Sequence, residues 1–154
     1  MSAGVTAPLR IEPDVVKDPR VHALPVAASA AQAAQMMARE GAGALVVLEG
    51  DGRFAGIVTD QDLVREVLAK GLDAGAVNLA TLVNRHQECL APSDLALDAL
   101  DLMRIRNVSH LPVIVDEEVI AVVSIGDICA AVSRTLDVQL RQHEAAVFGD
   151  LLQE

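Results

Sequence analysis

One short pattern occurs twice in this chain, each time at an expected change from an apolar strand to a helix. The first copy, residues 56–63, reads GIVTDQDL, and the second, residues 121–128, reads AVVSIGDI. Each copy places a hydroxyl residue three positions before an aspartate, at the expected start of the helix. Because a pattern repeated at such a distance is typical of duplicated supersecondary units, the chain is limited to folds with two similar halves.

Each copy lies within a longer run of five expected elements: a strand, a helix, two strands joined by a hairpin, and a second helix. In the first half these are expected at residues 21–24, 29–40, 44–48, 54–58 and 60–70. In the second half they are expected at residues 88–90, 95–106, 111–115, 120–123 and 126–132. The first helix of each half is followed by Gly41 or Asn107, residue types that accept the left-handed conformation at a helix end.

The closing helix of each half is amphipathic, and its apolar residues are expected to face the core. In the first half these residues are Leu63, Val64, Val67 and Leu68. In the second half Cys129 follows Ile128 and is expected to be a small buried apolar residue.

The pattern predicts an α+β fold in which two βαββα repeats pack against each other about an approximate two-fold axis. One repeat alone is too small to bury its sheet and helices well, and a second copy solves that. The expected parts are an N-terminal arm (1–20) that packs on the surface or frays, a first repeat (21–70), a linker (71–87) with a helical turn at 79–83, a second repeat (88–135) and a C-terminal helix (136–154).

The expected C-terminal helix carries a narrow apolar seam on an otherwise polar surface. The seam consists of Leu136, Leu140, His143, Val147 and Leu151. Since the two repeats complete a core without this helix, it either folds back on the domain or packs against a second subunit. A homodimer is the expected assembly.

Composition excludes several classes of partner. The formal net charge of -10 repels duplex nucleic acid and anionic membranes. Only two aromatic residues, Phe54 and Phe148, are present, too few for a base-stacking surface. No apolar stretch approaches the length of a membrane span, and the N-terminus lacks a basic segment followed by an apolar run. Two cysteines form no disulfide framework, so a cytoplasmic location is expected.

The motifs resemble those of a tandem pair of CBS domains, also called a Bateman module, as in the stand-alone CBS-pair signal-transduction proteins of bacteria. The similarity is carried by residues 43–47 and 56–63 in the first half and by 106–113 and 122–128 in the second. It covers about residues 21–135, and two copies in register make it specific.

The resemblance implies a non-catalytic regulatory module that binds AMP, ADP, ATP or S-adenosylmethionine in the cleft between the repeats, with no other cofactor. In this family the hydroxyl contacts phosphate and the aspartate holds the ribose hydroxyls, which nominates the pairs Thr59 with Asp62 and Ser124 with Asp127. Strand residues implied to flank the base are Ala44, Leu45, Val46, His110, Leu111 and Pro112. A regulated enzyme or transporter is the implied partner.

Three departures from the family pattern weaken the expectation of polyphosphate binding more than that of adenosine binding. Many nucleotide-binding members carry arginine where this chain has Gln61 and Gly126, and the glycine that opens the first motif is Ala121 in the second. Arg106 is a candidate phosphate contact, although the helix dipole alone favours a cation at a helix end. His110 is either a structural strand residue or a donor to phosphate.

The same residues allow a reading without a ligand. A hydroxyl at the helix N-cap with an acid three residues later is a capping box, which stabilises a helix by itself. The alternative function is therefore structural: dimerisation, or docking to another protein, with the clefts unused. No nucleophile and base form a catalytic pattern, and the spacing of His86 and Cys89 lacks the further ligands of a metal site.

Overall fold

The first repeat forms a three-stranded sheet covered by helices. The computed structural model describes residues 7–17 and 20–153. Its elements are β1 (Ala23–Pro25), α1 (Ala30–Glu40), β2 (Ala44–Leu48), β3 (Phe54–Thr59) and α2 (Asp60–Leu63), which continues as a π-helical turn, Val64–Leu68. The strand order is β1-β2-β3, with β1 parallel and β3 antiparallel to β2. A 3-10 turn, Leu79–Thr81, lies in the connection to the second repeat, as expected.

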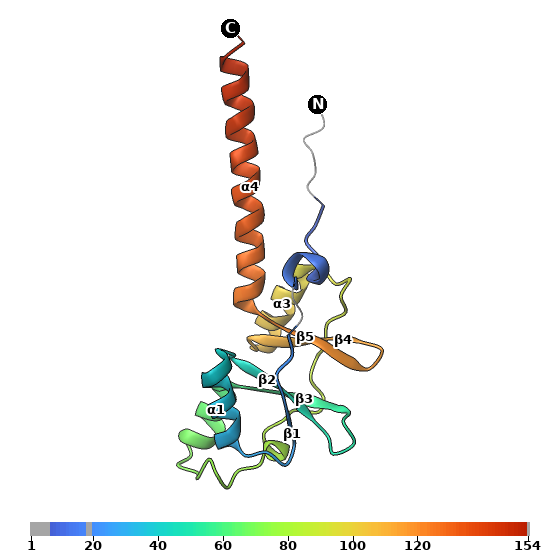
Figure 1. The fold of residues 1–154 in the computed structure, drawn as a ribbon, viewed down its shortest axis with the longest axis vertical. Coiled ribbons are helices and arrows are strands. Elements are labelled where there is room, and N and C mark those ends of the chain that lie inside the picture. Colours follow the sequence, from blue (N-terminus) through green and yellow to red (C-terminus); the bar gives the residue numbers. More distant parts are fainter. Residues whose placement is uncertain (1–6, 18–19, 154) are drawn as a thin grey trace.

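The second repeat follows the same order. Its elements are α3 (Ala96–Arg106), β4 (His110–Val115), β5 (Glu118–Ser124) and α4 (Ile125–Leu151). β4 and β5 are antiparallel, and Leu90 forms a single parallel bridge to Val113 where the first repeat has β1. Figure 1 places the two repeats as two lobes, one beneath the other. The predicted α+β fold with two repeats is confirmed.

The contacts between the repeats have the exchange symmetry of a two-fold axis. β2 contacts β5, and β3 contacts β4. Exchanging the repeats turns the first contact into the second, because β2 corresponds to β4 and β3 to β5. Each repeat has its own aliphatic core, with Met37 and Met103 buried at corresponding positions of α1 and α3. Each repeat is therefore held together by its own core, and the contacts between these strands lie at the boundary between the two repeats.

Local sequence explains how the helices begin and end. Ser29 and Gln32 form a reciprocal capping box at the start of α1. Gly41 (φ 65°) and Asn107 (φ 53°) end α1 and α3 in the left-handed conformation, as predicted. Asp116 and Glu117 both have positive φ, so the β4–β5 connection is a two-residue turn that matches the strand twist.

Ile11 lies deeper than the surface position expected for the N-terminal arm. Its side chain is fully buried in the core of the second repeat, and its backbone N–H donates to the carbonyl of Asp94. Residues 1–6 and 18–19 of that arm lie outside the described residues. The described part of the arm thus completes the core beside α3 (Figure 1).

Two expectations about the closing helices are wrong. Leu63 and Val67 are buried, but Val64 and Leu68 are 54% and 67% exposed, because the face they occupy has no partner within the described chain. Cys129 is exposed although its neighbour Ile128 is buried. In both cases a helix packs through a narrower stripe than its apolar composition indicates.

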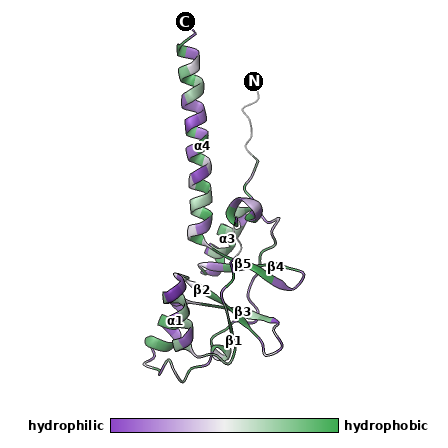
Figure 2. Cartoon of the chain, viewed as in Figure 1, coloured by the Kyte–Doolittle hydropathy of each residue, from purple (hydrophilic) through white to green (hydrophobic). Residues whose placement is uncertain are grey.

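The expected separate C-terminal helix is instead the continuation of α4, which runs unbroken for 27 residues. It does not fold back on the domain but leaves the two lobes (Figure 1). The seam residues Leu136, Leu140, Val147 and Leu151 are 46–65% exposed. Hydrophobic and hydrophilic residues alternate along its length (Figure 2). No helix in the described part of the chain is long and apolar enough to cross a membrane.

Candidate functional site

A cavity of about 490 Å³ lies at the boundary between the two repeats. Three segments line it: the β3–α2 corner of the first repeat, the end of the linker with the first residue of the second repeat (residues 82–88), and the α3–β4 connection of the second repeat at residues 106–111. The cavity therefore draws side chains from both halves of the duplicated fold. The family resemblance implied a ligand cleft at this boundary.

Thr59 and Asp62 hold the corner at which β3 becomes α2. The backbone N–H of Asp62 donates to Thr59 Oγ1 at 3.2 Å, and the N–H of Thr59 donates to Asp62 Oδ2 at 2.9 Å. This reciprocal capping box is formed without a ligand. Asp62 Oδ1 has no hydrogen-bond partner among the described residues, so one carboxylate oxygen is available to accept from hydroxyl groups in the cavity.

The linker forms a wall of this cavity because it is fixed to the first repeat. Gly56 in β3 allows a close approach: a Cβ there would stand 2.4 Å from Val83 Cγ2 and 2.8 Å from the carbonyl oxygen of Asn84. Gln87 Oε1 accepts from the backbone N–H of Ile57 at 3.1 Å. The linker thus runs beside the edge of β3 and brings its own side chains to the site.

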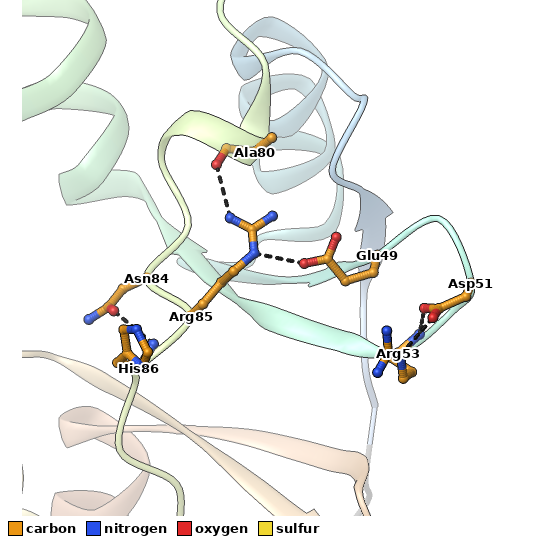
Figure 3. A network of polar contacts seen from close by, with 7 residues as sticks. All are labelled: Glu49, Asp51, Arg53, Ala80, Asn84, Arg85 and His86. Carbon is orange, nitrogen blue, oxygen red and sulfur yellow. Dashed lines mark hydrogen bonds and ion pairs between the residues drawn. The ribbon is translucent and has the colours of Figure 1, made fainter.

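Arg85 anchors the same wall from the outside. Its Nε donates to Glu49 Oε1 at 2.7 Å, and its Nη1 donates to the carbonyl of Ala80 at 3.4 Å. Figure 3 shows the guanidinium directed toward the β2–β3 hairpin, with Asn84 and His86 on the other side of the linker. Asn84 and His86 line the cavity, whereas Arg85 does not. The ion pair therefore positions the linker without taking part in the site.

The opposite wall carries an ion pair and a histidine. Arg106 Nη2 lies 2.6 Å from Glu88 Oε1, which joins the end of α3 to the linker. Ser109 Oγ lies 2.8 Å from His110 Nδ1. Burial lowers the pKa of His110, and the carboxylates of Asp60, Asp127 and Asp62 oppose that shift only in part. The imidazole is therefore mainly neutral near neutral pH and able both to donate and to accept.

The second corner has the same geometry but faces another cavity. The N–H of Asp127 donates to Ser124 Oγ at 3.0 Å, and the N–H of Ser124 donates to Asp127 Oδ2 at 2.8 Å. Asp127 lines a cavity of about 500 Å³ together with Lys17 and Arg134, and Ser124 does not line it. The two acid–hydroxyl pairs are thus not brought into one cavity.

Five of the expected site residues line the first cavity: Thr59, Asp62, Arg106, His110 and Leu111. Ala44, Leu45, Val46 and Pro112 lie in β2 and β4 and do not line it. Gln61 and Arg65 of the first helix after the corner also line it. Asn84, His86 and Gln87 were not expected at the site, because they belong to the linker between the expected repeats. Glu88, the first residue of the expected strand 88–90, was not expected there either.

No group of three or more histidine, cysteine, aspartate or glutamate side chains gathers in the described ranges in a way that would hold a metal ion. His86 and Cys89 therefore belong to no such group among the described residues. Burial raises the pKa of the Cys89 thiol, and the negative charge of Glu88 raises it further.

Comparison with known proteins places these residues in a family. The family model described as "CBS domain" matches residues 13–69 and 80–134. The mitochondrial CBS domain-containing protein CBSX3 of Arabidopsis thaliana is 30% identical over 121 residues, which cover 76% of this chain. That match spans 59% of CBSX3, and matches to the next three curated relatives span 14–29% of their lengths. The remainder of each relative lies outside the comparison.

Two solved structures share both fold and sequence with the chain. A CBS-domain protein from Burkholderia ambifaria superposes with a TM-score of 0.71 at 28% identity, covering 77% of this chain and 90% of that one. The CBS domain protein PAE2072 from Pyrobaculum aerophilum, solved in complex with AMP, has a TM-score of 0.70 at 27% identity and covers 79% of this chain and 91% of that one.

Proposed function

Because the chain belongs to the CBS-domain family, we propose that it is a non-catalytic regulatory module that binds an adenosine-containing ligand between its two repeats. One observation carries this proposal. The first cavity gathers the hydroxyl and acid of Thr59 and Asp62 from one repeat with Arg106 and His110 from the other. A ligand in contact with both walls would couple the two halves.

The chemistry of the cavity suits an adenosine compound. The free oxygen of Asp62 can accept from the vicinal hydroxyls of a ribose, while Arg65 and Arg106 offer positive charge to a phosphate. The complex of the related PAE2072 protein with AMP supports the same ligand class. AMP, ADP, ATP and S-adenosylmethionine are the candidates, and Ser124 with Asp127 is the corresponding pair at the start of α4, beside the cavity of about 500 Å³.

We further propose that the chain acts as a homodimer and passes the ligand signal to a regulated enzyme or transporter by a change in dimer geometry. The exposed apolar seam of α4 supports this, since four large aliphatic residues stand in water along one helix. A cytoplasmic location belongs to the same proposal, because Cys89 and Cys129 are both unpaired.

Ligand-dependent thermal unfolding tests the proposal. AMP at about one hundred times its dissociation constant is expected to raise the unfolding midpoint by roughly 5–10 °C. Asp62→Ala should abolish this shift. Gln32→Ala is the control, because it removes the capping residue at the start of α1, which has the same type of capping box and does not line the first cavity. A full shift in the Asp62→Ala protein would contradict the assignment.

A ligand-free structural or docking protein is the alternative, favoured by the neutral Gln61 and by the capping boxes that are complete without ligand. It predicts a stable dimer and no midpoint shift with any of the four adenosine compounds.

A further inference from the structure

The first cavity contains its own anionic competitor for a ligand phosphate. Two arginines, Arg65 and Arg106, and two carboxylates, Asp62 and Glu88, line the same space. One oxygen of Asp62 accepts from the backbone N–H of Thr59, and the other is the proposed acceptor for ribose hydroxyls. Glu88 instead reaches across the cavity wall to the end of α3, where its Oε1 lies 2.6 Å from Arg106 Nη2. The guanidinium with which the second repeat could meet a phosphate is therefore already paired.

Arg65 differs from Arg106 in this respect. Its guanidinium has no ion pair or hydrogen bond with any residue that the structure describes. Of the two arginines in the cavity, Arg65 is free and Arg106 is paired with the carboxylate of Glu88. A phosphate that binds Arg65 displaces no ion-pair partner, but a phosphate that binds Arg106 must share the guanidinium with Glu88 or displace Glu88.

Displacement has an electrostatic cost that depends on the charge of the ligand. An uncharged nucleoside does not compete for Arg106 and leaves the pair intact. A phosphate brings negative charge beside the Glu88 carboxylate, and like charges at this separation repel. Since the side chains of Arg106 and Glu88 are 56% and 43% exposed, water screens the effect and keeps it moderate.

We propose that Glu88 is a specificity residue that weakens binding of phosphorylated adenosine ligands at the first cavity relative to the uncharged nucleoside. The proposal rests on the proposed function, and it assigns the preference for ligand charge to the first residue of the second repeat, directly after the linker. The contrary possibility, that Glu88 orients Arg106 for phosphate, makes the opposite prediction for the same substitution.

Calorimetric titration with adenosine and with AMP separates these cases. In Glu88→Gln, we expect AMP to bind about twofold to fivefold more tightly, while adenosine affinity stays unchanged. Glu88→Ala should change AMP affinity in the same direction. The gain should disappear in the Glu88→Gln/Arg106→Gln double variant, because the released guanidinium is then absent.

Asp101→Asn is the matched control. It adds the same unit of net charge on α3 and breaks the pair between Arg104 and Asp101, which lies outside the cavity. It should change neither affinity. Weaker AMP binding in Glu88→Gln, or an equal change for both compounds, would overturn the role of Glu88 while leaving the proposed function intact. Absence of binding of both compounds to every one of these proteins would overturn this inference. If ADP, ATP and S-adenosylmethionine also failed to bind the wild-type protein, the proposed function would be overturned as well.

Discussion

Gly56 is the residue on which the linker wall depends. The Cβ of any other residue would overlap the side chain of Val83 and the backbone of Asn84. Gly56→Ala is expected to lower the free energy of unfolding by about 1–3 kcal/mol, because the linker or β3 must move. Gly126→Ala is the control: its Cβ would stand 3.5 Å from Ser124 Oγ, in ordinary contact, and should change stability by less than about 1 kcal/mol. Urea unfolding of both variants measures the difference.

The lowered pKa of His110 is expected to make the stability of the protein depend on pH. Burial lowers its pKa in the folded protein below the ordinary 6.5, so the unfolded chain binds the proton more readily. The contribution of neutral His110 to the free energy of unfolding is therefore fully present above pH 6.5, the ordinary pKa, and is lost as the pH falls through the lower pKa of the folded protein. Between about pH 8 and about pH 5, the wild-type protein should lose more stability than His110→Asn. Equal losses in denaturant titrations of the two proteins would contradict this.

At the scale of the elements, α4 divides into a packed part and an unpacked part. Ile128 and Ala131 are buried, whereas the residues of the seam from Leu136 onward are exposed. Truncation after Thr135 is therefore expected to leave a folded two-repeat domain with the circular dichroism of a packed protein. If the seam pairs two chains, light scattering should give a monomer for the truncated protein and a dimer for the full chain. A truncated protein that remains dimeric would place the interface elsewhere.

The elements themselves could be predicted because their signals are local. Gly41 and Asn107 mark the helix ends, and the apolar strands lie between turn residues. The continuity of α4 could not be predicted in this way, since the helix of the repeat and the helix with the seam meet without any breaker at Ser133 to Leu136. The exposure of Val64, Leu68 and Cys129 depends on what packs against each helix, which composition does not reveal.

The candidate site was predictable to the extent that it belongs to the repeat. The corner residues Thr59 and Asp62 follow from the duplicated pattern, and the structure brings them to the cavity with Arg106 and His110. The contribution of residues 84–88, above all Glu88, depends on the path of the linker, which Gly56 and Arg85 hold against the first repeat. The path of these residues could not be predicted, because they carry no repeated motif.

At the scale of the whole molecule, a ligand in the first cavity would contact residues of both repeats. AMP is therefore expected to slow amide hydrogen exchange at residues 59–62 and at residues 106–111 together, because both segments line the cavity. The hairpin turns at residues 50–52 and 116–117 lie outside it and serve as the internal control. Protection confined to one lobe, measured by mass spectrometry, would show that the ligand does not couple the repeats.

Because α4 is long, a small rotation of the second repeat would displace the far end of the helix by a large distance. Its first turn is capped by Ser124 and Asp127 at the base of the second lobe, and the helix continues for 27 residues. At about 1.5 Å per residue, this is a rigid rod of roughly 40 Å, so a tilt of about 10° at its base displaces the far end by about 7 Å. A change in lobe angle too small to alter either core would thus be magnified at the tip into a shift that another protein could sense.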